Sequence, residues 1–304
     1  MDNNEVCEIL LNWNLQNIKI EKIYNTAWQA GDSYILKEYH DLQMLERNLK
    51  ILGILDKMHI PVGRIVPVVN NNGLYVKNGD LFYFLSEKLS GGNLKNITDI
   101  KGTALKVGGI IACLHKVFKE CENDINGLWN NSLLDEMNNW VRKNFEDNNW
   151  KYISKEEYGQ AVLNLSDLYN SLPVQLIHRD VHFGNFLFKD GQFSGYIDFD
   201  LSQRNIRVFD ICYFVLGLLA EEELKLTQEQ WFVFLKHTFT GYNNTLGLQE
   251  AEKKAVPYVM ECIELLFASY FESINNMPCA DGAINIYKFI KKNEDKITGI
   301  INYI

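Results

Sequence analysis

A group of polar residues in the middle of the chain has the types and spacing expected of a catalytic site. His178-Arg179-Asp180 is followed by Asn185, five residues after the aspartate, and then by Asp198-Phe199-Asp200. Four specified residues, each at roughly one in twenty, match a given window by chance only about once in 10⁵. The pattern is therefore a strong signal that chemistry concentrates here.

These residue types suit phosphoryl transfer from a nucleotide to a hydroxyl. That reaction needs an acceptor hydroxyl in line with the γ-phosphate, and divalent cations that bridge the phosphate oxygens. Mg²⁺ prefers oxygen ligands and keeps several waters, so Asp198 and Asn185 are sufficient protein ligands. Asp180 lies on the loop before them, where an acceptor hydroxyl would arrive. A carboxylate with an ordinary pKa of about 4 is a weak base, so we expect it to orient the hydroxyl more than to deprotonate it.

Phosphoryl transfer also needs a cation on the phosphates. Lys37 lies in an expected strand, Tyr34–Tyr39, and the helix expected after that strand carries Glu46. A lysine on the phosphates that is held by a helix carboxylate is a recurring arrangement in such sites. A strand lysine taken alone is more often a solvated surface residue. The motif from His178 to Asp198 is what favours phosphate binding by Lys37.

The elements that must position these residues change character along the chain. Short runs rich in β-branched and aromatic residues, separated by turn residues, predict strands, and leucines from Leu42 to Leu55 at three- or four-residue spacing predict one amphipathic helix. The strands are expected at 18–23, 27–29, 34–39, 64–70, 73–77 and 81–87. The first part of the chain is therefore expected to be a β-meander interrupted by one helix.

Ser90-Gly91-Gly92-Asn93 breaks the periodicity and is expected to be a hinge. Helices dominate after it, near 100–119, 131–148, 155–171, 208–220, 227–242, 248–272 and 282–303, with strand-like runs at 174–177, 186–188 and 193–197. The expected fold class is α+β. We expect two domains, a nucleotide-binding lobe at 1–89 and a helical catalytic and acceptor-binding lobe at 90–304.

Composition excludes several classes of protein. Thirty Lys and Arg against 39 Asp and Glu give a net charge of −9 over 304 residues, which disfavours a nucleic-acid partner bound by a broad basic surface. The longest apolar stretch, Val208–Ala220, contains Asp210 and is shorter than the ~20 residues that span a bilayer, so no membrane partner is expected. The N-terminus shows no secretory signal. Six cysteines without CxxC spacing predict reduced thiols in a cytoplasmic protein.

The run from Ile177 to Leu187, IHRDVHFGNFL, resembles the catalytic loop of the aminoglycoside phosphotransferase/choline kinase family, the small-molecule branch of the protein-kinase-like fold. Ile197-Asp198-Phe199-Asp200 resembles that family's metal-binding segment, and the similarity continues through Asp210-Ile211-Cys212 and Phe239–Tyr242. It thus covers most of the chain. The resemblance implies a bilobal protein-kinase-like fold, with a small antiparallel β-rich N-lobe and a larger, mainly helical C-lobe.

The resemblance also implies cosubstrates and residue roles. ATP, or another nucleoside triphosphate, and Mg²⁺ would be used. Asp180 would be the catalytic aspartate, and Asn185 and Asp198 the metal ligands. Lys37 and Glu46 would form the phosphate-clamping pair. The backbone near Ser86, Glu87 and Lys88 would hold the adenine, and Asp210 would buttress the catalytic loop.

The expected function is an ATP-dependent kinase that phosphorylates a hydroxyl of a small molecule in a cleft between the lobes. The acceptor stays open among aminoglycoside-, amino-alcohol- and homoserine-like compounds, as does the oligomeric state. Asp200 replaces the glycine of a protein kinase's Asp-Phe-Gly, and no Ala-Pro-Glu follows, so a protein substrate is disfavoured. The glycine-free loop Tyr24–Ala27 leaves an alternative, a nucleotide-binding pseudokinase-like protein with a structural or regulatory role.

Overall fold

The computed structural model describes residues 3–125, 129–221, 224 and 226–304. It contains two compact units: unit 1 is an antiparallel sheet with two helices, and unit 2 is mainly helical. The α+β class and the two kinds of lobe are therefore confirmed. The functional division at residue 89 stays a prediction. By its contacts the chain divides into Met1–Leu94, Asn123–Gly127 and Phe183–Asp200 for unit 1, and Lys95–Glu122, Leu128–His182 and Leu201–Ile304 for unit 2.

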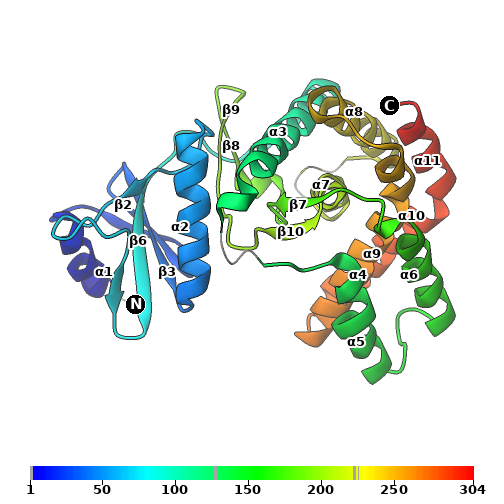
Figure 1. Cartoon of the computed structure of the whole chain (residues 1–304), viewed down its shortest axis with the longest axis horizontal. Helices are drawn as coiled ribbons and strands as arrows, with labels where there is room; N and C mark the ends of the chain where they lie inside the picture. Colours follow the sequence, from blue (N-terminus) through cyan, green and yellow to red (C-terminus); the bar gives the residue numbers. More distant parts are fainter. Residues whose placement is uncertain (1–2, 126–128, 222–223, 225) are drawn as a thin grey trace. The chain divides into compact units, whose positions relative to one another are not determined.

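Within the described part of unit 1, six strands form one antiparallel sheet of order β1-β2-β3-β6-β4, with β5 also paired to β6. The turns predicted from Asn and Gly residues separate these strands. Figure 1 shows the sheet with α1 on one side and α2 on the other. The strands are β1 (Ile20–Tyr24), β2 (Ala27–Ala30), β3 (Tyr34–Tyr39), β4 (Ile65–Val66), β5 (Val76–Asn78) and β6 (Leu81–Glu87), and the helices are α1 (Asn3–Leu10) and α2 (Leu42–Lys57).

Strand β3 has two different faces because side chains alternate along a strand. Leu36 points into an apolar core that includes Trp28 and residues of α1. Lys37 and Tyr39 point to the opposite face, toward α2, where Asn48 of that helix donates to the Tyr39 hydroxyl at 2.5 Å. The core therefore holds β3 in the register that presents Lys37 on one defined face of the sheet.

The hairpin of β8 (Phe186–Lys189) and β9 (Gln192–Tyr196) also belongs to unit 1. It is held by the segment predicted to be a hinge: the Gly92 amide donates to the Phe188 carbonyl at 3.0 Å, and the Phe188 amide donates to the Gly92 carbonyl at 2.8 Å. Gly91 has φ +103, and a Cβ there would lie 2.5 Å from the Phe188 carbonyl oxygen. Only glycine allows this close approach.

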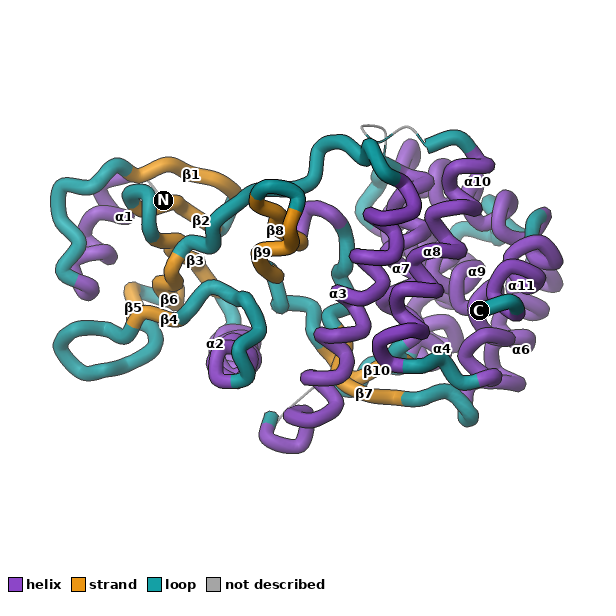
Figure 2. The backbone as a smooth tube through the Cα atoms, turned by 90° about the horizontal axis from the view of Figure 1, so that it is seen from above, coloured by secondary structure: helices purple, strands orange, loops and turns teal. Residues whose placement is uncertain are grey.

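Unit 2 is built around the long helix α9, which contacts α6, α7, α10 and α11 (Figure 2). Its two strands, β7 (Val174–Ile177) and β10 (Gln203–Ile206), pair with each other. The helices are α3 (Ile100–Cys121), α4 (Leu133–Glu136), α5 (Arg142–Asp147), α6 (Lys155–Tyr169), α7 (Val208–Ala220), α8 (Gln228–Leu246), α9 (Glu250–Ser273), α10 (Met277–Lys292) and α11 (Glu294–Asn302).

Two sequence predictions for the helices were wrong. Helix α8 does not end near Gly241; it continues to Leu246. Gly241 instead allows close packing on α3, because a Cβ at this residue would lie 2.1 Å from the Leu105 carbonyl oxygen. The single helix predicted over 282–303 is two helices: α10 ends at Lys292, and α11 begins at Glu294.

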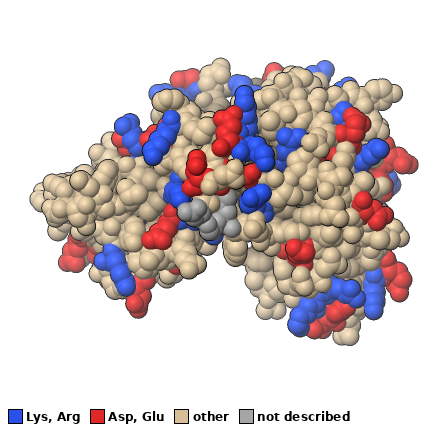
Figure 3. Space-filling model, in the orientation of Figure 1, with Lys and Arg blue, Asp and Glu red and all other residues tan. Residues whose placement is uncertain are grey.

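Ser154 caps the N-terminus of α6 as predicted, and its hydroxyl accepts from the Glu157 amide at 3.1 Å. All six cysteines are free thiols. None of the helices in the described ranges is long and apolar enough to cross a membrane. On the face of the molecule seen in Figure 3, basic and acidic side chains are interspersed in each unit.

Candidate active site

The clearest polar cluster of unit 1 surrounds Lys37. Its ammonium donates to Asp198 Oδ1 at 2.9 Å and to Asp200 Oδ2 at 3.2 Å. Burial acts to lower the pKa of Lys37, but Asp200 and Asp198 outweigh burial and raise it. The lysine is therefore charged at any working pH, and it is held between two carboxylates by charge-assisted hydrogen bonds.

A second layer of hydrogen bonds positions Asp200. The Tyr39 hydroxyl donates to Asp200 Oδ1, and Asn48 of α2 donates to the same hydroxyl. Burial, followed by the charge of Asp200, raises the pKa of Tyr39, so the phenol remains a donor. This chain of contacts links α2 to the carboxylates that hold Lys37.

The structure does not place Glu46 on Lys37. Glu46 is exposed on α2, and the ion pairs of Lys37 are with Asp198 and Asp200. Residues two apart on a helix lie on nearly opposite sides, so burying Asn48 against Tyr39 turns Glu46 outward. The expected lysine–glutamate clamp is therefore replaced in this structure by a lysine held by two aspartates.

Asn185 and Asp198 lie at the two ends of the β8–β9 hairpin. The Asn185 carbonyl accepts from the amide of Ile197, the residue before Asp198, at 3.0 Å. Asn93 donates through its side-chain amide to the carbonyls of Phe183 and Gly184 and so holds the turn before Asn185. Asp198 has φ +65, a left-handed conformation that is costly for a residue with a Cβ and recurs at functional sites.

The oxygen donors of this cluster fit a magnesium ion. Asp198 and Asp200 offer carboxylates and Asn185 an amide oxygen, all ligands that Mg²⁺ prefers. Within the residues the structure describes, no group of three or more His, Cys, Asp or Glu is arranged to hold a metal. The donor set therefore suits an ion that takes its remaining ligands from phosphates and water.

Ser86, Glu87 and Lys88 lie at the end of β6 and just beyond it. Ser86 is buried and pairs with both β3 and β4. The Glu87 amide donates to the Arg64 carbonyl at 2.8 Å, and the Lys88 amide donates to the Ser33 carbonyl at 2.7 Å. Both amides are therefore already engaged within the fold.

Asp180 belongs to unit 2, in the loop that follows β7. The loop backbone is fixed by Asp210 of α7, which accepts from the amides of His178 and Arg179, both at 2.9 Å. The expectation that Asp210 buttresses this loop is confirmed. Asp210 is itself held by His115 of α3, whose Nε2 lies 2.9 Å from Oδ2. The buried His178 ring shapes the turn, since the Asp180 amide donates to its Nδ1 at 3.4 Å.

Arg179 adds a second anchor to this loop. Its guanidinium binds both carboxylate oxygens of Glu136, at 2.8 and 3.0 Å, and lies over the Phe209 ring at 4.8 Å. Its backbone has φ +71. The side-chain contacts hold a strained residue next to Asp180.

The carboxylate of Asp180 is engaged at both oxygens. The Tyr213 hydroxyl donates to Oδ1 at 2.8 Å, and His182 Nε2 lies 3.6 Å from Oδ2. Burial acts to raise the pKa of Asp180, but His182 and Tyr213 outweigh burial and lower it to about 2. Asp180 is therefore ionised at neutral pH and is a poor base, suited to accepting a hydrogen bond.

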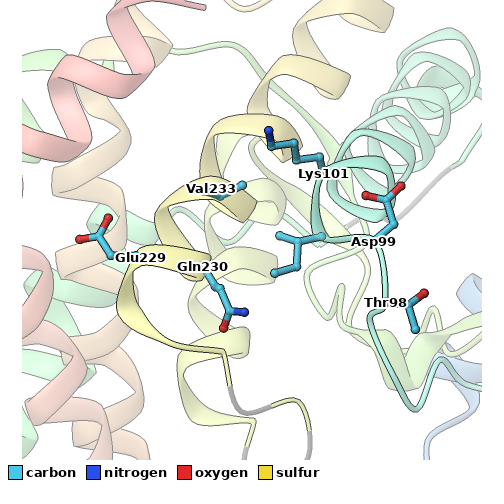
Figure 4. A pocket seen from close by; sticks show the side chains of 7 residues that line it. Thr98, Asp99, Lys101, Glu229, Gln230 and Val233 are labelled. Atoms are coloured by element: carbon cyan, nitrogen blue, oxygen red, sulfur yellow. The ribbon is translucent and has the colours of Figure 1, made fainter.

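The hollow in Figure 4 lies elsewhere in unit 2, at the N-terminal ends of α3 and α8. None of the residues predicted from the sequence lines it. Asp99 and Gln230, on its wall, cap these two helices, and Glu229 is paired with Lys296 at 3.1 Å. These three polar side chains of the hollow are thus already used within the fold.

Sequence reasoning assigned no site role to Asp200, Tyr39, Asn48 or Tyr213. Asp200 could have been found from the sequence, because it belongs to the Asp198-Phe199-Asp200 segment. Tyr213 and Tyr39 act through contacts between distant parts of the chain, with Asp180 at a separation of 33 residues and with Asp200 at a separation of 161, and Asn48 acts through Tyr39. No local pattern marks them.

A model of the phosphotransferase enzyme family matches residues 20–246. Homoserine kinase of Phenylobacterium zucineum (strain HLK1) is 30% identical over 115 residues, which are 37% of this chain and 34% of that protein, so most of that relative lies outside the match.

Solved structures are similar over nearly the whole chain. Amicoumacin kinase hAmiN, in complex with AMP-PNP, Ca2+ and Ami, has a TM-score of 0.71 at 18% identity, covering 97% of this chain and 94% of that one. The GDP and kanamycin complex of APH(2")-IIia has a TM-score of 0.69 at 13% identity, covering 96% and 99%. At these identities the likeness is one of fold.

Proposed function

The chain belongs to the phosphotransferase enzyme family, and on that premise we propose that it is a kinase that moves the γ-phosphate of ATP to a hydroxyl of a small molecule. The observation that carries the proposal is the cluster of unit 1, where Lys37 is held by Asp198 and Asp200 beside Asn185. A cation next to hard oxygen donors is what a metal-bound triphosphate needs.

Each group of this cluster has a proposed task. Mg²⁺ would be held by Asp198 and Asn185 and would neutralise charge on the phosphates. Lys37 binds the α- and β-phosphates, and Asp200, held by Tyr39, keeps the lysine in place. The carbonyl oxygens near Ser86, Glu87 and Lys88 accept from the nucleotide base.

Asp180 is proposed to orient the acceptor hydroxyl. With a pKa of about 2, its carboxylate accepts a hydrogen bond from the hydroxyl and takes the proton only late, as the bond to phosphorus forms. Positioning of this kind supplies about 7–11 kcal/mol, more than the ~3–5 kcal/mol of a typical general base. Tyr213 and His182 fix the direction in which the carboxylate points.

The acceptor is proposed to be aminoglycoside-, amino-alcohol- or homoserine-like. The matched relatives include a homoserine kinase and a kanamycin complex. The proposed donor is ATP or another nucleoside triphosphate, since the solved structures of this fold include an AMP-PNP complex and a GDP complex. A cytoplasmic location is part of the proposal and agrees with the six free thiols.

A second candidate is a nucleotide-binding protein with weakened catalysis. The connection between β1 and β2, from Tyr24 to Ala27, contains no glycine, so side chains limit how closely backbone amides approach a phosphate there. This protein would bind MgATP without phosphorylating an acceptor.

One experiment separates the two candidates. ADP release is measured with MgATP and a panel of acceptors (aminopropanol, homoserine and kanamycin), using wild type, Asp180→Asn and Asp198→Asn. A kinase releases ADP in proportion to acceptor; Asp180→Asn abolishes turnover with little change in ATP affinity, and Asp198→Asn weakens metal-dependent ATP binding. Tight MgATP binding without acceptor-dependent ADP release supports the binding protein instead.

A further inference from the structure

His182 lies two residues after Asp180, in the same loop of unit 2. Its Nε2 is 3.6 Å from Asp180 Oδ2, and 42% of its side chain is exposed, against 25% for Asp180. Val181, between them, is fully buried and anchors the loop. The imidazole therefore stands at the surface, next to the carboxylate proposed to orient the acceptor.

The two oxygens of Asp180 have different surroundings. Oδ1 accepts from the Tyr213 hydroxyl at 2.8 Å, and this phenol stays a donor because burial raises its pKa. Oδ2 faces His182. A carboxylate oxygen has two lone pairs, so Oδ2 can meet an acceptor hydroxyl and the imidazole together. The separation of 3.6 Å is longer than a hydrogen bond, and catalytic contacts of this kind often shorten when substrate binds.

Transfer of a phosphoryl group to a hydroxyl releases a proton that Asp180 does not keep. Burial acts to raise the pKa of Asp180, but His182 and Tyr213 outweigh burial and lower it to about 2. At pH 7 only about one such carboxyl in 10⁵ is protonated. An imidazole ordinarily titrates near pH 6.5, so it is a stronger base than this carboxylate and takes the proton from it readily.

Other titratable groups around the loop differ from His182 in their burial and in their partners. They are buried or are held by contacts within the fold: Arg179 with Glu136, Asp210 with His115 and two loop amides, the Tyr213 phenol facing Asp210 and Glu264, and His178 with the Asp180 amide. Among these groups, His182 is the one whose ring meets both Oδ2 of Asp180 and solvent.

We propose that His182 is the proton acceptor that returns Asp180 to its carboxylate form after each phosphoryl transfer. The inference rests on the kinase function proposed above. As the acceptor oxygen bonds to the γ-phosphorus and the bond from that phosphorus to the ADP oxygen breaks, the hydroxyl proton passes to Asp180 Oδ2. From there it passes to Nε2 of the neutral His182 ring, and the imidazolium then releases a proton to solvent.

This role makes the rate of transfer depend on pH in a defined way. A ring that already carries a proton cannot accept another, so the wild-type rate is expected to rise with pH across about pH 6.5. Glutamine at this position accepts no proton at any pH. Below this range, wild type is therefore expected to fall to the rate of His182→Gln.

The test measures the single-turnover rate of phosphoester formation from MgATP and aminopropanol, homoserine or kanamycin between about pH 5 and pH 9. The proteins are wild type, His182→Gln, His182→Ala with and without free imidazole, and His237→Gln. His237 is the matched control, because it makes the same chemical change on α8, where Lys101 and Lys236 act on the ring.

We expect His182→Gln to lower the rate about 10- to 100-fold above pH 7, to remove the rise near pH 6.5 and to leave the KM for ATP unchanged. Free imidazole restores the rate of His182→Ala, and His237→Gln behaves as wild type. A folded His182→Gln with the wild-type rate and pH profile overturns the inference and leaves the kinase function standing. An equal loss of rate at every pH, or no restoration by imidazole, also overturns it.

A second measurement does not depend on turnover. NMR signals of the histidine rings, followed against pH, give the titration midpoint of His182 in wild type and in Asp180→Asn. If Oδ2 faces Nε2, removing the charge of Asp180 lowers this midpoint, because a neighbouring carboxylate favours the charged ring. An unmoved midpoint overturns the inference. A lowered midpoint in a protein that phosphorylates none of the acceptors supports the proton contact and counts against the kinase function.

Discussion

Replacing Tyr213 by phenylalanine removes one hydrogen bond to Asp180 and changes little else. The variant keeps the ring that stacks on Phe209 at 6.0 Å and contacts Phe267 at 5.6 Å. A hydrogen bond to a charged group is worth about 1.5–3 kcal/mol. Since a quarter of the Asp180 side chain is exposed, water replaces part of this bond, and the lower figure of about 1.5 kcal/mol applies.

The expected kinetic effect follows from this magnitude. At 1.36 kcal/mol per factor of ten, the kcat/KM for the acceptor falls roughly tenfold. The KM for ATP is unchanged because the cluster around Lys37 is untouched. The Tyr213 bond lowers the pKa of Asp180, so removing it moves the acidic limb of the pH profile upward from about 2. Steady-state kinetics from about pH 2 to pH 8 measure all three quantities.

A matched control separates this effect from general loss of stability. The Tyr287 hydroxyl donates to Glu157 at 3.0 Å, also in unit 2, so Tyr287→Phe makes the same chemical change at another carboxylate. It is expected to lower the melting temperature while leaving kcat/KM at the wild-type value. If folded Tyr213→Phe keeps kcat/KM within about twofold of wild type, the positioning role of Tyr213 is wrong.

Three further predictions concern packing, pH and the phosphate-binding cluster. Gly241→Ala places a Cβ 2.1 Å from a carbonyl of α3, so it is expected to lower the free energy of unfolding, measured in urea, by about 3 kcal/mol. The control Gly217→Ala meets no atom within 4 Å and is expected to raise that free energy by about 0.5–1 kcal/mol. Equal urea midpoints for the two variants would refute this prediction. Burial raises the pKa of Glu261 from 4.5 to about 7, so the folded state binds more protons than the unfolded chain in this window, and stability is lost as pH rises through it. Glu261→Gln therefore gains up to about 3 kcal/mol over wild type between pH 5 and pH 8, and parallel pH curves would argue against it. Tyr39→Phe is expected to raise the KM for ATP roughly tenfold, because it removes a hydrogen bond that positions Asp200. Glu46→Gln is expected to change the KM for ATP by less than about twofold. A larger effect of Glu46→Gln than of Tyr39→Phe would identify Glu46 as the partner of Lys37.

Most elements could be predicted because local patterns determine them. The leucine spacing of α2 and the strand alternation of β3 report directly which face is buried. The polar strand β10, Gln203–Ile206, was missed because its Gln203 and Asn205 are buried polar residues that no hydrophobic pattern reveals. Gly241 was misread because a helix-ending glycine and a helix-packing glycine look the same without the neighbouring helix.

The candidate site shows the same division. Lys37, Asp198 and Asn185 could be named from motifs, and the structure brings them into one unit. The direction of the Glu46 side chain could not be predicted from its spacing in the sequence, because it depends on which face of α2 packs on Tyr39. The contacts of Tyr213 with Asp180 and Phe267 join α7, α9 and the loop of Asp180, and tertiary packing alone brings these three elements together.

The most direct test of the proposed reaction is to follow labelled γ-phosphate from ATP in the presence of aminopropanol, homoserine and kanamycin, with wild type and Asp180→Asn. We predict that wild type forms a labelled phosphoester of at least one acceptor and that Asp180→Asn, still binding MgATP, forms none. Label found only in inorganic phosphate, or equal phosphoester from both proteins, would contradict the assignment of Asp180 and of the kinase activity.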